Sequence, residues 1–363
     1  MSIRVGSPSE LSVNSEKVTA FFKKEWPRPI SLGDNEFYSW QFIKTPYQNH
    51  EDSCCIVIND NREILGVMGV NDRYFMLENK KHYGAELTTW IIKEEYRNKG
   101  FALKIINYLQ EKYDVLIGMG ISNDALPVYL RNGFHYLKAI PRFIKVLDWK
   151  QIDKYADYSH LAKKVDKYWS KQLQIKKYAI KQANESNIKR ICCEFYLNNN
   201  LFSRDYEYIK WRYIEHPNYA YNVCIVYSQE NTNGCFVATR VEETESGLRI
   251  LHILDIFGGS HDISAAISYL VKYASERNIP IIDFFCTNSL INSFFIQNGW
   301  FSTLDDTFFQ FPHLFQPIEL RIPPTTSMIY WSKTNDAELL NLGKLYITKQ
   351  DADFDRPILK QGE

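Results

Sequence analysis

One pattern of residues occurs twice in this chain. Residues 34–46 and residues 205–217 share Asp, Glu, an aromatic residue, Trp, a second aromatic residue, Ile and Pro at a constant offset of 171 residues. Two shorter pairs follow in the same order, 55–57 with 224–226 and 129–134 with 295–300. Self-similarity of this kind indicates a repeated structural unit. Because 363 residues are enough for two domains of ordinary size, we predict a tandem duplication of one fold.

The order of elements expected in the first copy indicates an α/β fold with a mixed sheet. From hydrophobic periodicity and turn signals we expect strands at 2–5, 54–58, 63–73, 86–92, 115–121 and 134–147, and helices at 12–26, at 34–46, from 101 and from 123. We assign residues 1–150 to the N-terminal domain, 151–177 to a helical connector, 178–340 to the second domain and 341–363 to a C-terminal tail.

A short basic loop joins the strand at 86–92 to the helix that begins at Phe101. The first backbone N–H groups of a helix have no partner within the helix, and they lie at the positive end of its dipole. Arg97 and Lys99 stand beside them, and Gly100 lets the backbone come close to a ligand. The loop is therefore suited to bind a phosphate or pyrophosphate.

These residues carry a resemblance to a known family. Arg97-Asn98-Lys99-Gly100-Phe101-Ala102 resembles the Arg/Gln-x-x-Gly-x-Gly/Ala pyrophosphate loop of the GNAT acyltransferases, which bind coenzyme A. Residues 123–134 resemble the next family element, although Pro127 interrupts the usual spacing. The resemblance implies acyl-CoA as co-substrate, without a metal. It implies the following coenzyme contacts: Trp90, Ile91, Ile92, Arg97, Asn98, Lys99, Gly100, Phe101, Ala102 and Asn123.

Acyl transfer to an amine requires a base for the amine proton, an acid for the departing thiolate and stabilisation of an oxyanion. Glu86 lies fourteen residues before Gly100, a spacing that resembles the glutamate base of histone-type GNAT enzymes. Tyr129 lies where the family often has the tyrosine that protonates the thiolate. The family also implies a backbone N–H near Trp90 or Ile91 for the oxyanion. His82, His50 or a water molecule are the alternatives for the base.

The second copy differs from the first where this chemistry would occur. Its strand at 251–257 runs into Gly258-Gly259-Ser260-His261-Asp262, which lacks the Arg and Lys of the first loop. Phe295 replaces Tyr129, so the hydroxyl is lost. We expect the second domain to be degenerate and to form a wall of the acceptor site. The alternative is that it only covers the back of the first sheet.

The C-terminal tail carries carboxylates at alternate positions, followed by Arg356 and Pro357. Residues 346–357 contain neither the glycine nor the final glutamate of a calcium-binding loop, and a disordered acidic tail is the default interpretation. The Asp-x-Asp-x-Asp-Arg-Pro ending also resembles that of tandem GNAT enzymes of surface-polysaccharide pathways, such as the anthrose pathway. Those enzymes acylate an amino sugar carried on a nucleotide, for example dTDP-4-amino-4,6-dideoxyglucose.

That narrower resemblance implies a small-molecule acceptor bound between the two domains. Candidate acceptor contacts are Tyr38, Tyr83, Asp353, Asp355 and Arg356. Trp40 is interpreted as a core residue because Trp211 repeats it. The competing functions are an N-acetyltransferase for another small amine or peptide, an aminoacyl-tRNA-dependent transferase and a non-catalytic acyl-CoA sensor.

Composition adds few constraints. Lys plus Arg and Asp plus Glu both number 43, so net charge gives no case for nucleic acid or a membrane surface as partner. Neither a signal-peptide pattern nor a run of 18 apolar residues occurs, and we expect a cytoplasmic protein. The seven cysteines show no metal-ligand spacing, and reduced thiols are expected.

Overall fold

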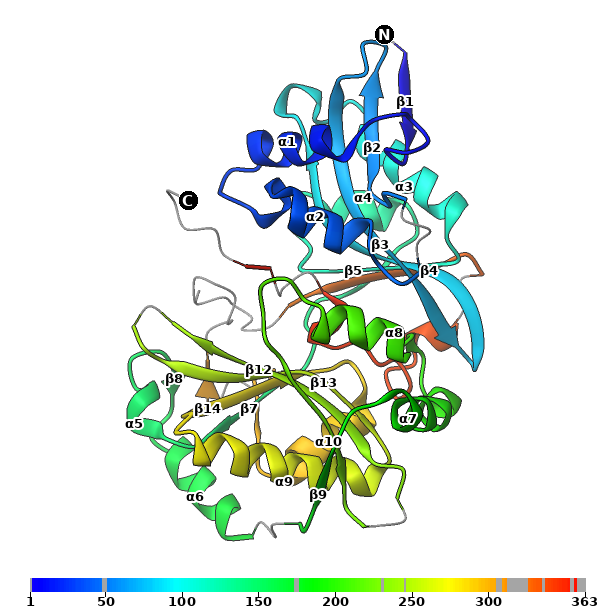
Figure 1. The fold of residues 1–363 in the computed structure, drawn as a ribbon. Helices are drawn as coiled ribbons and strands as arrows, with labels where there is room; N and C mark the ends of the chain where they lie inside the picture. The colour runs from blue at the N-terminus through cyan, green and yellow to red at the C-terminus, as the bar shows by residue number, and fades with distance from the viewer. Residues whose placement is uncertain are drawn as a thin grey trace.

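The computed structural model describes residues 2–47, 51–172, 176–229, 232–244, 246–304, 309–311, 326–334, 337–352 and 356–357. Two mixed sheets dominate it, one in the upper and one in the lower half of Figure 1. The expected α/β class with two mixed sheets is confirmed. Among the described helices, none is both long and apolar enough to cross a membrane.

The first copy folds in the expected order. Its helices are α1 (Ser15–Glu25), α2 (Asn35–Phe42), α3 (Phe101–Lys112) and α4 (Leu126–Arg131). Its strands are β1 (Ile3–Gly6), β2 (Cys55–Asn59), β3 (Ile64–Leu77), β4 (Lys80–Ile92), β5 (Val115–Met119) and β6 (His135–Leu137). Helices α1 and α2 pack on one face of the sheet, and α3 and α4 pack on the other.

The second copy repeats this order. Its helices are α7 (Glu185–Asn198), α8 (Tyr206–Ile209), which continues as a π-turn at Lys210–Ile214, α9 (Ser260–Glu276) and α10 (Ser289–Gln297). Its strands are β9 (Ala179–Gln182), β10 (Leu201–Phe202), β11 (Asn222–Tyr227), β12 (Cys235–Glu243), β13 (Arg249–Gly258), β14 (Ile281–Phe285) and β15 (Phe301–Ser302). The repeated segment even keeps its N-cap, since Asp34 accepts a hydrogen bond from the Phe37 N–H and Asp205 from the Tyr208 N–H.

Each sheet contains at least one strand from the other copy, and β10 of the second copy pairs with β3 of the first sheet. The first sheet has the order β1-β2-β3-β4-β5-β17-β6, and the second has the matching order β9-β11-β12-β13-β14-β7-β15. Strand β7 (Arg142–Val146) follows β6 in the chain but pairs with β14 of the second sheet. Strand β17 (Met328–Ser332) returns from the second copy and pairs with β5 and β6 of the first sheet. The single strand expected at 134–147 is therefore wrong, and each sheet is completed by the other half of the chain (Figure 1).

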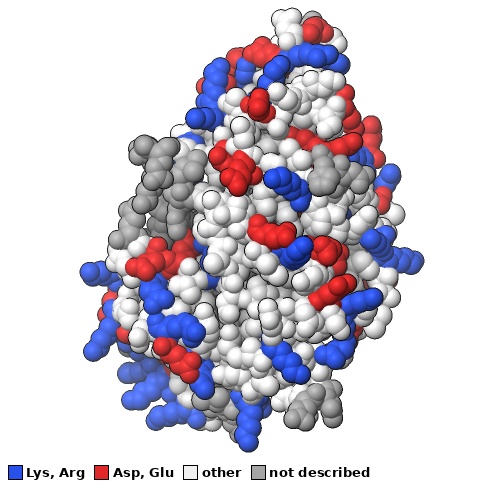
Figure 2. Space-filling view, viewed as in Figure 1, with Lys and Arg blue, Asp and Glu red and all other residues white. Residues whose placement is uncertain are grey.

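The connector region is partly helical. It contains α5 (Trp149–Ile152), the short strand β8 (Asp157–Tyr158) and α6 (Ala162–Gln172), and β8 pairs with β16 (Phe309–Gln310). Asp166 of α6 anchors the region, because its carboxylate binds Lys145 of β7 at 3.0 Å and accepts from the indole of Trp149 at 2.9 Å. In Figure 2, Lys and Arg side chains gather at the lower left over α5 and α6, whereas charges of both signs are mixed elsewhere on this face.

The two copies meet through the tryptophans of the repeated segments. The rings of Trp40 and Trp211 are stacked, with centroids 4.7 Å apart and an interplanar angle of 18°. The Trp211 indole N–H donates to the Trp40 carbonyl at 3.0 Å, and the Trp40 N–H points to the Trp211 carbonyl at 3.4 Å. The core interpretation of Trp40 agrees with this packing, which places the start of one copy against the start of the other.

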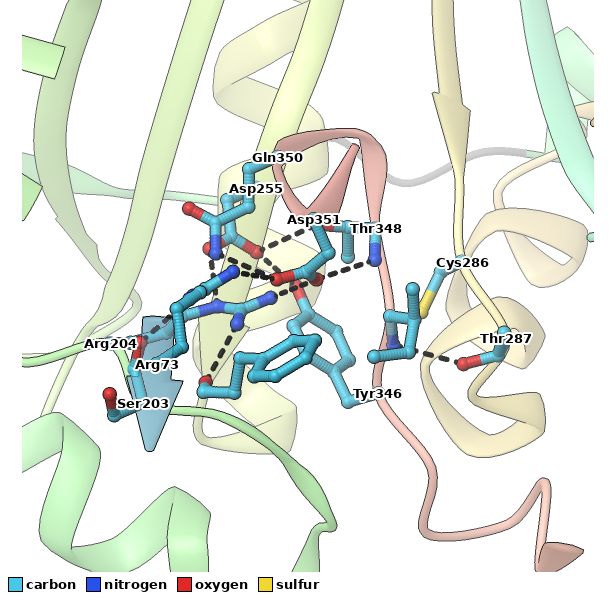
Figure 3. Close-up of polar contacts among 12 residues, drawn as sticks. Arg73, Ser203, Arg204, Asp255, Cys286, Thr287, Tyr346, Thr348, Gln350 and Asp351 are labelled. Carbon is cyan, nitrogen blue, oxygen red and sulfur yellow. Dashed lines mark hydrogen bonds and ion pairs between the residues drawn. The ribbon is translucent and has the colours of Figure 1, made fainter. Parts of the chain in front are cut away.

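The C-terminal segment is ordered and buried as far as Ala352. Residues 345–347 are fully buried, and the short helical turn at Lys349–Asp351 follows them. Two carboxylates and two guanidiniums form a network at this turn (Figure 3): Asp351, Asp255 of β13, Arg73 of β3 and Arg204. The default interpretation of a disordered tail is therefore wrong for this part.

Within this network Asp351 accepts hydrogen bonds from both arginines. Arg73 Nη1 lies 2.7 Å from its Oδ1, and Arg204 Nη2 lies 2.5 Å from its Oδ2, while Arg204 Nε binds Asp255 at 3.0 Å. All four side chains are at most 1% exposed. Burial acts to raise the pKa of Asp351, but the guanidiniums of Arg204 and Arg73 outweigh it and hold this pKa below its usual value. The network joins the two sheets and the C-terminal segment.

We expect Asp351→Asn to lower the free energy of unfolding by about 3–5 kcal/mol, because it leaves two buried guanidiniums short of countercharge. Urea denaturation with an unchanged m-value measures this loss. Asp157→Asn, which alters an exposed carboxylate on β8, is the matched control and should change stability by less than about 0.5 kcal/mol. Equal stability of the two variants would contradict a structural role for the network.

Candidate active site

A cavity lies where the two copies and the C-terminal segment meet. It encloses about 310 Å³ of empty space, with the open solvent at its mouth included. The lining residues come from α2, β3, β4, α8 with its π-turn, and the C-terminal segment: Phe37, Trp40, Gln41, Asn71, Glu86, Tyr208, Trp211, Arg212, Gln350, Ala352 and Arg356. Glu86 and Arg356 are thus brought together from opposite ends of the chain.

Strand β4 separates this cavity from the loop that precedes α3. Ala85 and Leu87 face the core under α3 and α4, so Glu86 between them faces the cavity. Glu86 is 3% exposed, and the Asn71 amide Nδ2 lies 3.4 Å from its Oε2. A buried carboxylate in a cavity has the setting that a general base requires.

A bulge interrupts β4 just after Glu86. The register between β3 and β4 shifts between Met68 and Val70, so that Leu87 and Trp90 face the same side with two threonines between them. In the described chain, pairing of β4 with the parallel strand β5 covers only Gly84–Leu87. The backbone from Thr88 onward therefore leaves the β5 ladder.

Arg356 binds at this bulge. Its Nε donates to Gln41 Oε1 at 3.2 Å, its Nη2 to Thr88 Oγ1 at 3.4 Å, and its Nη1 to Thr89 Oγ1. Its carbonyl accepts from the Tyr219 hydroxyl at 3.1 Å. The guanidinium therefore sits at the cavity beside Glu86. The neighbouring candidates Asp353 and Asp355 lie outside the described residues, as does His50.

The loop before α3 has the geometry expected of an anion site. Asn98 and Gly100 adopt positive φ angles of 61° and 81°, and a Cβ at Gly100 would have nothing within 4 Å. The N-terminus of α3 has no side-chain cap, so its first N–H groups point to an open surface. Arg97 and Lys99 are exposed there, with Arg97 Nε 3.3 Å from the Ile92 carbonyl and Lys99 Nζ 5.0 Å from the Tyr96 ring centroid.

The remaining predicted coenzyme contacts lie around this loop. Ile91 is buried, while Trp90 and Ile92 are half-buried at the end of β4. Asn123 is exposed in the turn before α4, and Pro127 is accommodated because it lies in the first turn of that helix. Tyr129 is 3% exposed and packs edge-on against Trp90, with ring centroids 5.3 Å apart. Burial raises the pKa of the Tyr129 hydroxyl, which keeps the hydroxyl protonated and makes it a weaker acid.

Two predicted acceptor contacts are wrong. Tyr38 is fully buried and donates to Asp52 at 2.7 Å, so its ring has no face for a ligand. Tyr83 points to the α3 side of β4, stacks on Tyr113 and donates to Asp72 at 2.6 Å. The alternative base His82 lies four residues from Glu86 on β4, about 13 Å along the strand, and does not line the cavity. Sequence periodicity could not show that Phe37 and Trp40 line the cavity whereas Tyr38 is buried away from it.

The second copy lacks an open anion site at the corresponding helix. Asp262 in the first turn of α9 is buried and accepts hydrogen bonds from Ser228, Thr232 and the Gly234 N–H. A pyrophosphate there would meet this carboxylate. Gly258 serves packing, since a Cβ would lie 2.4 Å from the Gly234 carbonyl oxygen. Phe295, the counterpart of Tyr129, is fully buried in the core.

In the second sheet His252 occupies the position that matches Glu86, and the side chain of Lys349 fills the space beside it. Glu86 pairs across the ladders with Asn71 and Ile117, and His252 pairs with Arg240 and Asp283. Lys349 from the C-terminal segment enters here, with Nζ 2.8 Å from Asp283 Oδ1 and 2.7 Å from His252 Nδ1. Burial lowers the pKa of Lys349 to about 8, although Asp283 opposes the shift.

Comparison with known proteins agrees with this geometry. Residues 16–134, which run from α1 to the end of the α4 region, match the model of the acetyltransferase (GNAT) family. The first domain is therefore a GNAT-family domain. A search of curated proteins finds no match to the sequence.

Two solved structures share the fold over nearly the whole chain. A GCN5-related N-acetyltransferase from Anabaena variabilis is 12% identical with a TM-score of 0.55, covering 92% of this chain and 73% of that one. Saccharomyces cerevisiae N-myristoyltransferase with bound myristoyl-CoA is 10% identical with a TM-score of 0.50, covering 91% of this chain and 82% of that one. At 10–12% identity these two structures show the shared fold. The family match over residues 16–134 supports an acyl-CoA-dependent N-acyltransferase.

We expect Arg97→Ala to weaken coenzyme A binding by about 1.5–3 kcal/mol, because one charge-assisted contact to phosphate is lost while the fold is untouched. Calorimetric titration measures this change, and it should find one coenzyme site per chain in the wild type. Lys17→Ala, which removes an exposed cation from α1, is the control. Unchanged affinity in a folded Arg97→Ala variant would remove the loop from the coenzyme site.

We expect the stability difference between the wild type and Lys349→Met to depend on pH. An unfolded lysine titrates near 10.4, whereas the folded pKa of Lys349 is about 8. Between these values the unfolded chain binds more protons, so the wild type gains up to about 1.4 kcal/mol per pH unit relative to the variant as pH rises.

Denaturation of both proteins between pH 7.5 and 10.5 measures this gain. Lys333→Met, which removes an exposed lysine after β17, controls for the lost charge. A constant difference between the wild type and Lys349→Met across this range would contradict the prediction.

Proposed function

We propose that this protein is an acyl-CoA-dependent N-acyltransferase that acylates the amino group of a nucleotide-linked amino sugar, for surface polysaccharide or glycoprotein synthesis. The observation that carries the proposal is the buried carboxylate of Glu86, in a cavity between the domains and next to the point where β4 leaves β5. The family match supports the coenzyme, and the second domain and C-terminal segment supply the opposite wall of the cavity.

In this proposal the coenzyme and the acceptor bind on opposite faces of β4. Coenzyme A binds with its pyrophosphate at the N-terminus of α3, and its thioester reaches the gap between β4 and β5. Glu86 takes the proton of the attacking amine from the cavity side, and Tyr129 protonates the departing thiolate from the α4 side. Backbone N–H groups near Trp90 and Ile91 stabilise the oxyanion.

The lining of the cavity matches the parts of a sugar nucleotide. Arg356 and Arg212 bring positive charge for phosphate oxygens. Trp40, Trp211 and Tyr208 also line the cavity. Asp353 and Asp355 flank Arg356 in the sequence and remain proposed contacts to sugar hydroxyls. The tandem layout and the C-terminal motif favour an acceptor such as dTDP-4-amino-4,6-dideoxyglucose.

The proposal is tested by measuring thiol release from acetyl-CoA and longer acyl-CoAs across a panel of amino sugar nucleotides. We expect turnover with at least one 4-amino-4,6-dideoxy sugar nucleotide. Glu86→Gln should lower kcat by about 10²–10⁴-fold with unchanged coenzyme affinity, because only the base is lost. Turnover with charged tRNA alone, or coenzyme binding with no acceptor at all, would overturn the proposal.

We expect removal of the chain after Ala352 to raise the acceptor KM or lower kcat at least tenfold while coenzyme A affinity stays the same. The cut removes Arg356 but keeps the buried Asp351 network, which a cut after Lys349 would destroy. Arg356→Ala in the full chain is the matched variant and should show most of the effect. Normal acceptor kinetics in both proteins would exclude the C-terminal segment from the acceptor site.

A further inference from the structure

One buried polar atom at the cavity has no hydrogen-bond partner among the described residues. Asn71 is 5% exposed and lines the cavity beside Glu86. Its Nδ2 donates toward Glu86 Oε2 at 3.4 Å, and its Oδ1 has no hydrogen-bond partner among the described residues. An ionised carboxylate only accepts hydrogen bonds, so the amide nitrogen must face Glu86 and the acceptor oxygen must face away from it.

Leaving such an oxygen buried and unpaired costs free energy. Asn71 bears this cost next to the candidate base Glu86. Its Oδ1 is therefore available to a ligand that carries a hydrogen-bond donor. Gly69 and Val70 precede Asn71 on β3 at the bulge, so the side chain is held on a paired strand and is not free to turn to solvent. The unpaired oxygen therefore marks a fixed acceptor position beside Glu86.

We propose that Asn71 is a specificity-determining residue that selects primary amines as acyl acceptors. The inference rests on the proposed acyl transfer at Glu86. Attack of a primary amine on the thioester forms the C–N bond and leaves two protons on nitrogen. Glu86 takes one proton; the other stays on nitrogen and donates to Asn71 Oδ1. The C–S bond then breaks, and the thiolate takes a proton to leave as the free thiol of coenzyme A.

A secondary amine or a hydroxyl has only one proton at this stage. Glu86 takes it, and Asn71 Oδ1 stays unpaired in the product and in the transition state that leads to it. A site built to accept a substrate N–H discriminates strongly against an analogue that lacks the N–H. Asn71 Nδ2 meanwhile holds Glu86 in place. The same amide therefore orients the base and accepts a hydrogen bond from the second N–H of the acceptor.

The test compares two acceptors, an amino sugar nucleotide that the wild type turns over and its N-methylamino counterpart, each with acetyl-CoA. We expect the wild type to favour the primary amine in kcat/KM. Asn71→Leu, of similar shape, should lower kcat/KM for the primary amine by roughly tenfold or more and bring the ratio of the two acceptors close to one. The N-methyl acceptor should lose much less.

Asn71→Asp keeps an oxygen at the Oδ1 position and the side-chain shape, but it replaces the donor to Glu86 with a second carboxylate. This variant should retain the preference for the primary amine, and the pH at which the base titrates in kcat/KM should rise because two like charges lie close together. Asn71→Asp also keeps the inference testable if Asn71→Leu fails to fold.

Asn292→Leu is the matched control. Asn292 of α10 is also 5% exposed, has an unpaired Oδ1 and donates through Nδ2, to the Cys286 carbonyl, but it does not line the cavity. Its substitution should leave the ratio of the two acceptors unchanged. An equal loss for both acceptors in Asn71→Leu would show a purely structural role and overturn the inference. Failure of the wild type to acylate any amine would overturn the proposed function itself, and this inference with it.

Discussion

The arrangement of the two domains depends on the buried ion pairs of Asp351. Four charged side chains are removed from water at one point, which is tolerable only because each carboxylate meets a guanidinium in good geometry. The four residues come from the first sheet, the second sheet, the segment after β10 and the C-terminal turn. A rotation of one domain against the other would break at least one pair inside the protein. The network therefore holds the two domains in one relative orientation, and with it the shape of the cavity.

The C-terminal segment connects the Asp351 network to the candidate active site. Lys349 and Asp351 point into two different buried clusters, one in the second domain and one between the domains. Gln350 and Ala352 then line the cavity, and Arg356 crosses to the bulge of β4. In the second domain, Asp262 is buried at the start of α9, and Lys349 of the C-terminal segment binds at His252 and Asp283. Under the proposed function, the second domain is a scaffold for the acceptor side of the first domain.

The sequence predicted the features that depend on local pattern. The repeat at Asp34 and Asp205 and the loop at Gly100 follow from spacing, whereas Glu86 was selected by its resemblance to a family position. The strand exchange could not be predicted, because β-propensity shows that 142–146 is a strand but not which sheet it joins. The ion pair between Arg73 and Asp351 could not be predicted either, because no local sequence pattern relates residues so far apart in the chain. Tyr38 and Trp40 lie two positions apart on one short helix, and only the packing of the second copy decides which of them reaches the cavity.

The strand exchange also sets the order in which this protein can fold during synthesis. Strand β6 of the first sheet leaves the ribosome about 190 residues before β17, which must pair with both β5 and β6. At 5–20 residues per second, the first sheet waits roughly 10–40 s with an incomplete edge. Unpaired strand edges are sites of association between chains. The nascent chain thus passes through a period in which this edge of the first sheet is open to association, and β17 closes the edge in the finished molecule.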